Sequence, residues 1–305
     1  MSDKKPAAPF IASSDRSPEL PREDIHLMLE EAVEKLKVPR IRNACRNAIQ
    51  HLKKAWVLHP VDAEMSAFRA ITAEEEAATA VIRALRHQNY PNAGKLNDRS
   101  HPHKMSFWPF ISAVSSKMAE KNFAEPKISL RVEGEPRIDL SIDFGSQAGL
   151  DQPLLATPDE PFNFSMSSDY TGPFKIHDFA EELAEIASIK SARDIKAYVN
   201  TEANQRNVLL YASEKGIPSI EFEDSFLLAR RQRVTTLLFL TIAIMQTQTH
   251  QLFLVQCLDA LLRALKQFDG EGPELPTGDL KSARIELIEQ LDGSMKLSFI
   301  EPNSV

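Results

Sequence analysis

The sequence contains few glycines and few cysteines, and both shortages restrict what it can encode. It has ten glycines in 305 residues. No Walker loop, dinucleotide-binding fingerprint or Gly-x-Ser-x-Gly element occurs, which argues against the nucleotide-binding and acyl-transfer enzymes that use them. Cys45 and Cys257 lie far apart in the sequence. They read as two core thiols, and with no recognisable secretory leader they favour a reducing, cytoplasmic setting over a disulfide framework.

Long apolar runs and an excess of positive charge are also missing. The most apolar run, residues 234–245, continues into Gln246, Gln248 and His250, so it is too short for a bilayer and is better explained as a buried helix. We therefore expect no membrane span. The formal net charge of −7 argues against a surface coated by nucleic acid, and a polyanion such as RNA would have to bind a local basic patch.

The composition is that of a globular protein, with 43% hydrophobic and 26% charged residues. At this length, one large domain or two closely associated domains are expected. We predict a mainly α fold with the following parts: a disordered tail over residues 1–21, a helical bundle over 22–123, a β-hairpin over 124–144, a linker or long loop over 145–173, and a C-terminal helical unit with a terminal β-hairpin over 174–305.

Apolar periodicity and prolines define the elements of this prediction. In the first half we expect one helix before Pro39, a second from about Arg40 to Pro60, a third over residues 64–86 and a fourth from about Ser106, with a loop over residues 90–102. Period-two patterns predict strands at 128–132 and 138–144. In the second half the expected elements are helices at 177–188 and 192–215, a long helical region at 224–268 with room for a bend, and strands at 284–291 and 295–301.

The helix over residues 64–86 contains an acid on its packing face. At about 100° per residue, Glu74 falls within the apolar stripe, Glu75 lies at its edge and Glu76 points to solvent. Because burying an unpaired carboxylate is costly, we expect Glu74 to have a partner. An ordinary buried ion pair or a helix cap is one reading, and a functional site is the other.

Two short motifs resemble those of a known family. The segment Arg46-Asn47-Ala48-Ile49-Gln50-His51 fits the R-x4-6-H motif of HEPN domains, and residues 42–114 resemble the abortive-infection V type. That type has a paired glutamate followed by a histidine and lysine cluster, here Glu74-Glu75 and His101-Pro102-His103-Lys104. The resemblance implies a small helical bundle, often dimeric, in a family with many metal-independent ribonucleases of toxin, antiphage or RNA-processing systems.

The resemblance assigns Arg46, Asn47, His51 and Glu74 as catalytic candidates. An imidazole can move the proton of a ribose 2′-hydroxyl, and an arginine can stabilise charge at phosphorus. On a straight helix, however, Arg46 and His51 lie about 140° apart, so they would converge only across a dimer or on a distorted helix. Solvated helix side chains are the alternative.

Further binding candidates lie in the histidine cluster and in the second half of the chain. The cluster consists of His101, His103 and Lys104 beside Arg99, and we expect this loop to supply the cation for Glu74. Glu75 is a further binding candidate. A metal held by the two histidines and a glutamate is a weaker alternative, and we assign no metal and no cofactor.

In the second half, Glu202 and Arg206 are spaced for an ion pair within one helix. A partly buried pair there could simply fix helix register, or it could border a pocket between the two halves. Arg230, Arg231 and Arg233 read as a solvated basic face.

The sequence therefore favours a cytoplasmic, HEPN-like protein, homo-oligomeric, of a bacterial antiphage or toxin system. Its partners would be RNA and a protein encoded in the same operon. Any catalysis would be that of an endoribonuclease. The alternative is a non-catalytic helical module that binds a partner protein or a small ligand.

Overall fold

The computed structural model describes residues 17–120, 127–143, 155–167, 175–210, 220–265, 284–289 and 295–300. Contacts divide the chain into two units, residues 1–269 and residues 270–305. The fold is mainly helical, as predicted. Within the described residues, no helix is both long and apolar enough to span a bilayer.

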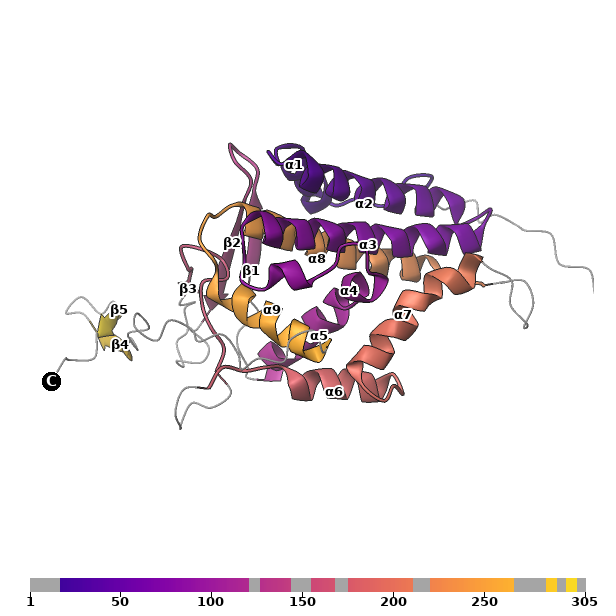
Figure 1. The fold of residues 1–305 in the computed structure, drawn as a ribbon. Coiled ribbons are helices and arrows are strands. Elements are labelled where there is room, and N and C mark those ends of the chain that lie inside the picture. The colour runs from indigo at the N-terminus through magenta and orange to yellow at the C-terminus, as the bar shows by residue number, and fades with distance from the viewer. Residues whose placement is uncertain are drawn as a thin grey trace, which may run out of the picture. The chain divides into compact units, whose positions relative to one another are not determined.

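Three helices form the first layers of the larger unit: α1 (Asp24–Glu34), α2 (Pro39–Leu58) and α3 (Ala63–His87). Pro39 opens α2, where its missing N–H costs nothing. The Asp62 carboxylate caps α3 by accepting a hydrogen bond of 2.8 Å from the backbone N–H of Met65. The helix α3 packs between α2 on one side and α8 (Asp224–Met245) on the other (Figure 1).

The last five residues of the predicted disordered tail are ordered. Residues 1–16 lie outside the described part, but residues 17–21 belong to the packed structure. The Leu20 side chain is buried, and the Trp56 indole N–H donates a hydrogen bond of 2.9 Å to the Ser17 carbonyl. These contacts provide the docking that an apolar-poor segment needs to become ordered.

The segment expected to be a loop before the fourth helix contains short helical elements. After α3 come a 3₁₀ turn, η1 (Ala93–Lys95), and α4 (His101–Met105), followed by α5 (Phe107–Glu120). Ser106 lies between α4 and α5 rather than capping a single helix; its hydroxyl donates to the His103 carbonyl. His101, His103 and Lys104 are therefore helical residues.

The predicted first hairpin is confirmed as β1 (Lys127–Arg131) and β2 (Arg137–Asp143), which pair antiparallel with Leu130 opposite Ile138. Gly134 in the turn has a φ of +77°, a conformation that glycine adopts without strain. A two-residue strand, β3 (Leu155–Ala156), adds to β2. This small sheet falls within the larger unit.

The second half supplies α6 (Ala180–Ile189), α7 (Ile195–Leu210), α8 and α9 (Leu252–Ala264). The region expected to be a long helix with room for a bend is two helices separated by residues 246–251. Gln246 and Gln251, at either end of this break, use their side-chain amides to hydrogen bond with backbone groups of Ile138, Phe162 and Ala243. Among these groups, the Ala243 carbonyl is one that a continuous helix would have bonded to the backbone N–H of Thr247.

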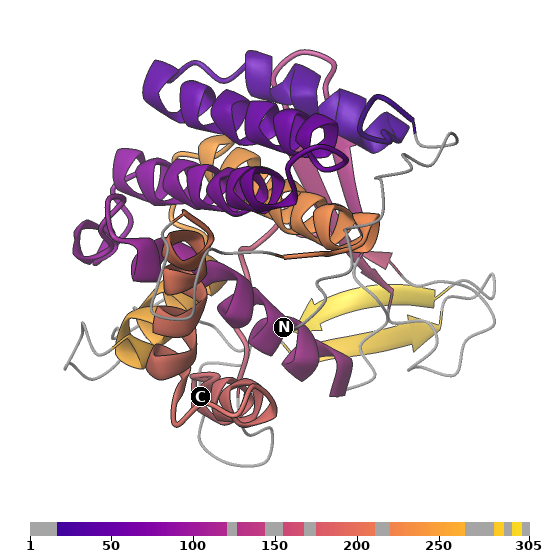
Figure 2. The same cartoon turned by 90° about the vertical axis from the view of Figure 1, so that its right-hand side faces the viewer.

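Both halves share one core, which differs from the separate bundles expected on either side of residues 145–173. Buried residues from α2, α3, α5, α8 and α9 belong to a single cluster. The helices α5, α7 and α9 lie on the side of α3 away from α1 and α2 (Figure 2). In the smaller unit, β4 (Arg284–Glu289) and β5 (Met295–Ile300) form the predicted antiparallel hairpin.

Candidate functional site

Glu74 is buried, as predicted, but its partners come from the second half of the chain. Its side chain is 1% exposed and forms an ion pair with the buried guanidinium of Arg230 on α8. A second α8 arginine, Arg233, approaches the same Oε2 atom to 3.4 Å and stacks on the Trp108 ring, with 5.1 Å between the guanidinium carbon and the ring centroid. Glu74 Oε1 has no hydrogen-bond partner among the described residues.

Glu75 is also buried, at 2% exposed, rather than lying at the edge of the packing face. Its carboxylate contacts three cationic side chains. His101 Nδ1 lies 2.6 Å from Oε1, while Lys104 Nζ and Arg206 Nη1 lie 3.3 Å and 3.1 Å from Oε2. The histidine and lysine belong to α4 and the arginine to α7. The expected cation cluster therefore neutralises Glu75, not Glu74.

The two acids are adjacent in the sequence, and the fold gives each carboxylate its own set of cationic partners. A 100° rotation per residue directs Glu74 to α8 and Glu75 to α4 and α7. Each carboxylate has the charged partners that a buried acid requires. The result is a continuous polar zone across α3, built from both halves of the chain.

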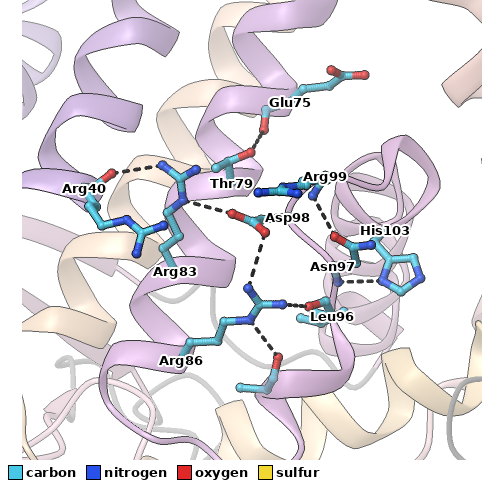
Figure 3. A network of polar contacts seen from close by, with 11 residues as sticks. Arg40, Glu75, Thr79, Arg83, Arg86, Leu96, Asn97, Asp98, Arg99 and His103 are labelled. Carbon is cyan, nitrogen blue, oxygen red and sulfur yellow. Dashed lines mark hydrogen bonds and ion pairs between the residues drawn. The ribbon is translucent and has the colours of Figure 1, made fainter.

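The loop before α4 is fixed to α3 by a separate ion-pair network (Figure 3). Arg83 Nε lies 3.1 Å from Asp98 Oδ2, and Arg86 Nη1 lies 3.3 Å from Oδ1. Burial alone would raise the pKa of Asp98, but the two guanidinium groups overcome this effect and hold its pKa below the ordinary value. Because Arg86 also donates to the Leu96 carbonyl, α4 begins at a fixed distance from Glu75.

His101 differs from the other partners of Glu75 because it remains accessible. Its side chain is 40% exposed, compared with 9% for Lys104. The Nδ1 atom faces the carboxylate, and the described residues offer no hydrogen-bond partner to Nε2. An imidazole that donates Nδ1–H to Glu75 keeps the lone pair on Nε2, where a ligand could reach it.

Arg206 completes the exposed side of this cluster. Its side chain is 28% exposed, and its guanidinium carbon lies 4.8 Å from the centroid of the Phe68 ring. The expected ion pair between Glu202 and Arg206 is not found in the described residues. Glu202 accepts a hydrogen bond of 2.6 Å from Gln205 instead, because Arg206 is directed toward the buried Glu75.

The structure does not bring the motif residues Arg46 and His51 together. Arg46 Nε donates to Glu34 Oε1 on α1 at 2.6 Å, and Asn47 borders an open groove beside it. The half-buried His51 has a pKa below its ordinary value because burial, and then Arg69, disfavour its protonated form. Its Nδ1 atom is buried without a partner among the described residues.

The remaining candidates have local roles. Arg99 is exposed, and its backbone N–H donates to Asn97 Oδ1 at 2.9 Å. His103 Nδ1 accepts a hydrogen bond of 3.0 Å from the Asn97 N–H, and burial lowers its pKa. In the part of the chain that the structure describes, no group of three or more His, Cys, Asp or Glu residues is positioned to hold a metal ion.

The basic residues of α8 were assigned to a solvated face, and this was wrong for Arg230, which is buried. The neighbouring Arg231 donates a hydrogen bond to the Pro21 carbonyl and forms an ion pair with Glu23. The helical spacing contained a usable signal. Arg230 follows Leu227 by three residues and precedes Val234 by four, so it lies on the same face as two apolar residues that are themselves buried.

No protein-family model matches the chain, and comparison with curated proteins and with solved structures finds no significant match either. The functional argument therefore rests on the geometry of the chain itself. That geometry offers a fixed carboxylate, an accessible imidazole and a guanidinium group within one cluster. Such groups can bind an anionic ligand and transfer a proton to or from it.

Proposed function

We propose that this chain is a HEPN-like, metal-independent ribonuclease whose proton-transfer centre is the Glu75–His101 pair. The observation that supports this proposal most is the contrast in exposure between the two partners. A buried carboxylate holds an imidazole that stays open to solvent. The carboxylate fixes the tautomer and orientation of the ring, which is the role of the acid in a catalytic triad.

The reaction follows from the exposed ring nitrogen. His101 Nε2 accepts the proton of a ribose 2′-hydroxyl, and the 2′-oxygen attacks the adjacent phosphorus. The bond from phosphorus to the 5′-oxygen breaks, the 5′-oxygen takes a proton from water, and the hydroxide that is left takes the proton of the His101 imidazolium. The products carry a 2′,3′-cyclic phosphate and a 5′-hydroxyl. The positive charge of imidazolium is stabilised by Glu75 throughout.

Arg206 supplies the positive charge that the phosphate needs. Arg206 contacts the same Glu75 carboxylate as His101. It is partly exposed, so it can direct a guanidinium N–H toward a phosphate oxygen. Lys104 is nearly buried and serves to neutralise Glu75. This division of roles suits a protein with a net charge of −7, in which RNA is bound through a local site.

The family resemblance extends the proposal to the setting of the protein. A bacterial antiphage or toxin system, a homo-oligomer and a partner protein from the same operon belong to this proposal. Within one chain Arg46 is paired with Glu34, so a role for Arg46 and His51 in RNA cleavage would require a second copy. The Glu75–His101 centre has no such requirement.

The alternative is a non-catalytic helical module, in which the same ion pairs only hold α4, α7 and α8 against α3. The exposure of His101 favours the catalytic proposal, because a purely structural pair has no need of a solvent-facing ring nitrogen. The two proposals differ in what removal of the His101 imidazole does: the catalytic proposal predicts a loss of RNA cleavage, and the non-catalytic one predicts no cleavage to lose.

The test is cleavage of labelled single-stranded RNA in the presence of a chelator. His101→Ala should slow cleavage by about 100-fold or more, the usual contribution of a general base. The matched control is His87→Ala, which removes an exposed imidazole at the end of α3 and should leave the rate unchanged. Equal cleavage rates for both variants, with native circular dichroism, would rule out His101 as the general base. RNA left intact by the wild-type protein would leave the non-catalytic module.

A further inference from the structure

A cavity of about 500 Å³ lies in the larger unit, within the usual size range for small-molecule pockets. Its walls come from α5, α8, α9 and the β1–β2 hairpin. The lining includes six phenylalanines: Phe107, Phe110, Phe162, Phe164, Phe239 and Phe253. None of the Glu75 partners lines it, so it is separate from the proposed ribonuclease centre.

The chemistry of the lining selects the kind of ligand. None of the described residues that line the cavity is Asp, Glu, Lys, Arg or His, so none of them would neutralise a charged group that entered it. Water would also be poorly held over most of its surface, because a buried water needs two to four polar partners. A ligand with a hydrocarbon or aromatic body would bury its surface against the rings.

The lining also contains four polar side chains. Gln232, Thr235 and Thr236 on α8 and Ser115 on α5 all contribute. Gln232 and Ser115 are exposed, and the two threonines are half-buried, so Gln232 and Ser115 lie where the lining meets solvent. They can hydrogen bond to an uncharged head group, such as a hydroxyl, without the cost of desolvating a charge.

We infer that this cavity binds a small uncharged amphiphile, with its apolar body among the phenylalanines and a neutral hydrogen-bonding group at an exposed polar residue of the rim, Gln232 or Ser115. A carboxylate or amine on the same body is disfavoured. The ligand class is therefore defined by the absence of charge as much as by the apolar surface.

Two probes with the same hydrocarbon chain test this inference on the full-length protein. Decan-1-ol should bind at one saturable site by titration calorimetry, and decanoate at neutral pH should bind at least ten times more weakly. Val114→Trp fills the cavity from α5 and should weaken decan-1-ol binding at least tenfold. The matched control is Ser116→Trp, an exposed α5 residue outside the lining, which should bind normally.

A second variant covers the case in which Val114→Trp does not fold. Ser115→Lys adds a cation at an exposed position on the rim, and it should raise decanoate affinity at least tenfold with little change for decan-1-ol. The inference is overturned if decan-1-ol shows no saturable binding, if wild-type protein binds both probes equally, or if Ser115→Lys leaves decanoate binding unchanged. RNA cleavage by His101→Ala does not enter this test, so the two proposals fail separately.

Discussion

At the scale of single residues, the ion pair of Glu74 accounts for the most unusual feature of α3. An acid at 1% exposure would be untenable alone, and Arg230 compensates it from within the same core. The net value of such a pair relative to an apolar pair is small, because both charges lose their hydration. Removing one partner is a different matter, since the other charge is then buried without compensation.

Glu74→Gln should therefore destabilise the protein. The amide can still accept one hydrogen bond but no longer neutralises Arg230, and we expect a loss of about 3 kcal/mol, typical of breaking a buried pair. Urea unfolding measures this change. Glu76→Gln, two positions along α3 and only half-buried, is the control and should change the free energy of unfolding by less than about 0.5 kcal/mol. Equal stability of the two variants would mean that Glu74 is not paired.

His51 gives the protein a pH dependence of known sign. Its folded pKa lies below the ordinary value of 6.5, so the unfolded chain takes up a proton before the folded chain does. The free energy of unfolding therefore falls as the pH decreases from about 7 through the window between the ordinary and the lowered pKa. Carboxyl groups such as Asp98 also have a lowered pKa. They stabilise the folded state above their unfolded pKa, and this stabilisation is lost at more acidic pH, as the pH falls through the lowered pKa.

His51→Gln should make the free energy of unfolding less dependent on pH between 7 and 5.5. Urea titrations at a series of pH values measure the slope. Some slope remains in the variant because the pKa values of His26 and His103 are lowered too. An unchanged slope would show that the His51 imidazole is not held in its neutral form.

At the scale of elements, glutamine side chains fix segments that lack regular structure. Gln256 accepts from the Met166 N–H at 2.9 Å and donates to the His177 carbonyl at 2.7 Å. Gln251 accepts from the Phe162 N–H at 2.9 Å and donates to the Ala243 carbonyl at 2.9 Å. Backbone groups of Phe162, Met166 and His177 are therefore attached to α9 and its N-cap residue, and such groups must be satisfied wherever they are buried.

Gln251→Leu should cost about 2 to 4 kcal/mol, because it leaves one buried N–H and one buried carbonyl without partners. Thermal or urea unfolding gives the value. Gln248→Leu changes an exposed glutamine in the same connection, and we expect it to alter stability by less than about 0.5 kcal/mol. A similar small effect for both would contradict the role assigned to Gln251.

Local signals predicted most of the helices and both hairpins. Pro39 and Pro60 bracket α2, the apolar stripe defines α3, and the turn at Gly134 separates β1 from β2. The break between α8 and α9 could not be predicted, since residues 246–251 contain neither glycine nor proline. It depends on hydrogen bonds from Gln246 to Ile138, 108 positions earlier in the chain, and long-range partners of this kind leave no trace in local periodicity.

At the scale of the whole molecule, the candidate site exists only because the two halves share a core. The acids come from α3, and their cations come from α4, α7 and α8. The sequence identified Glu74, Glu75, His101, Lys104 and Arg206 as candidates. It could not assign partners, because a one-residue difference on α3 decides which helix each carboxylate faces, and the packing of α7 and α8 against α3 is a tertiary property.

The most direct measurement of the central claim is the chemistry of the RNA ends. Single-stranded RNA would be incubated with the full-length protein and a chelator, and the fragments analysed by mass spectrometry. Proton transfer through His101 to a 2′-hydroxyl predicts 2′,3′-cyclic phosphate and 5′-hydroxyl ends, and no cut at a linkage carrying a 2′-deoxyribose. Fragments with 5′-phosphates, cutting at the 2′-deoxy linkage, or RNA left intact would contradict a ribonuclease centre at Glu75 and His101.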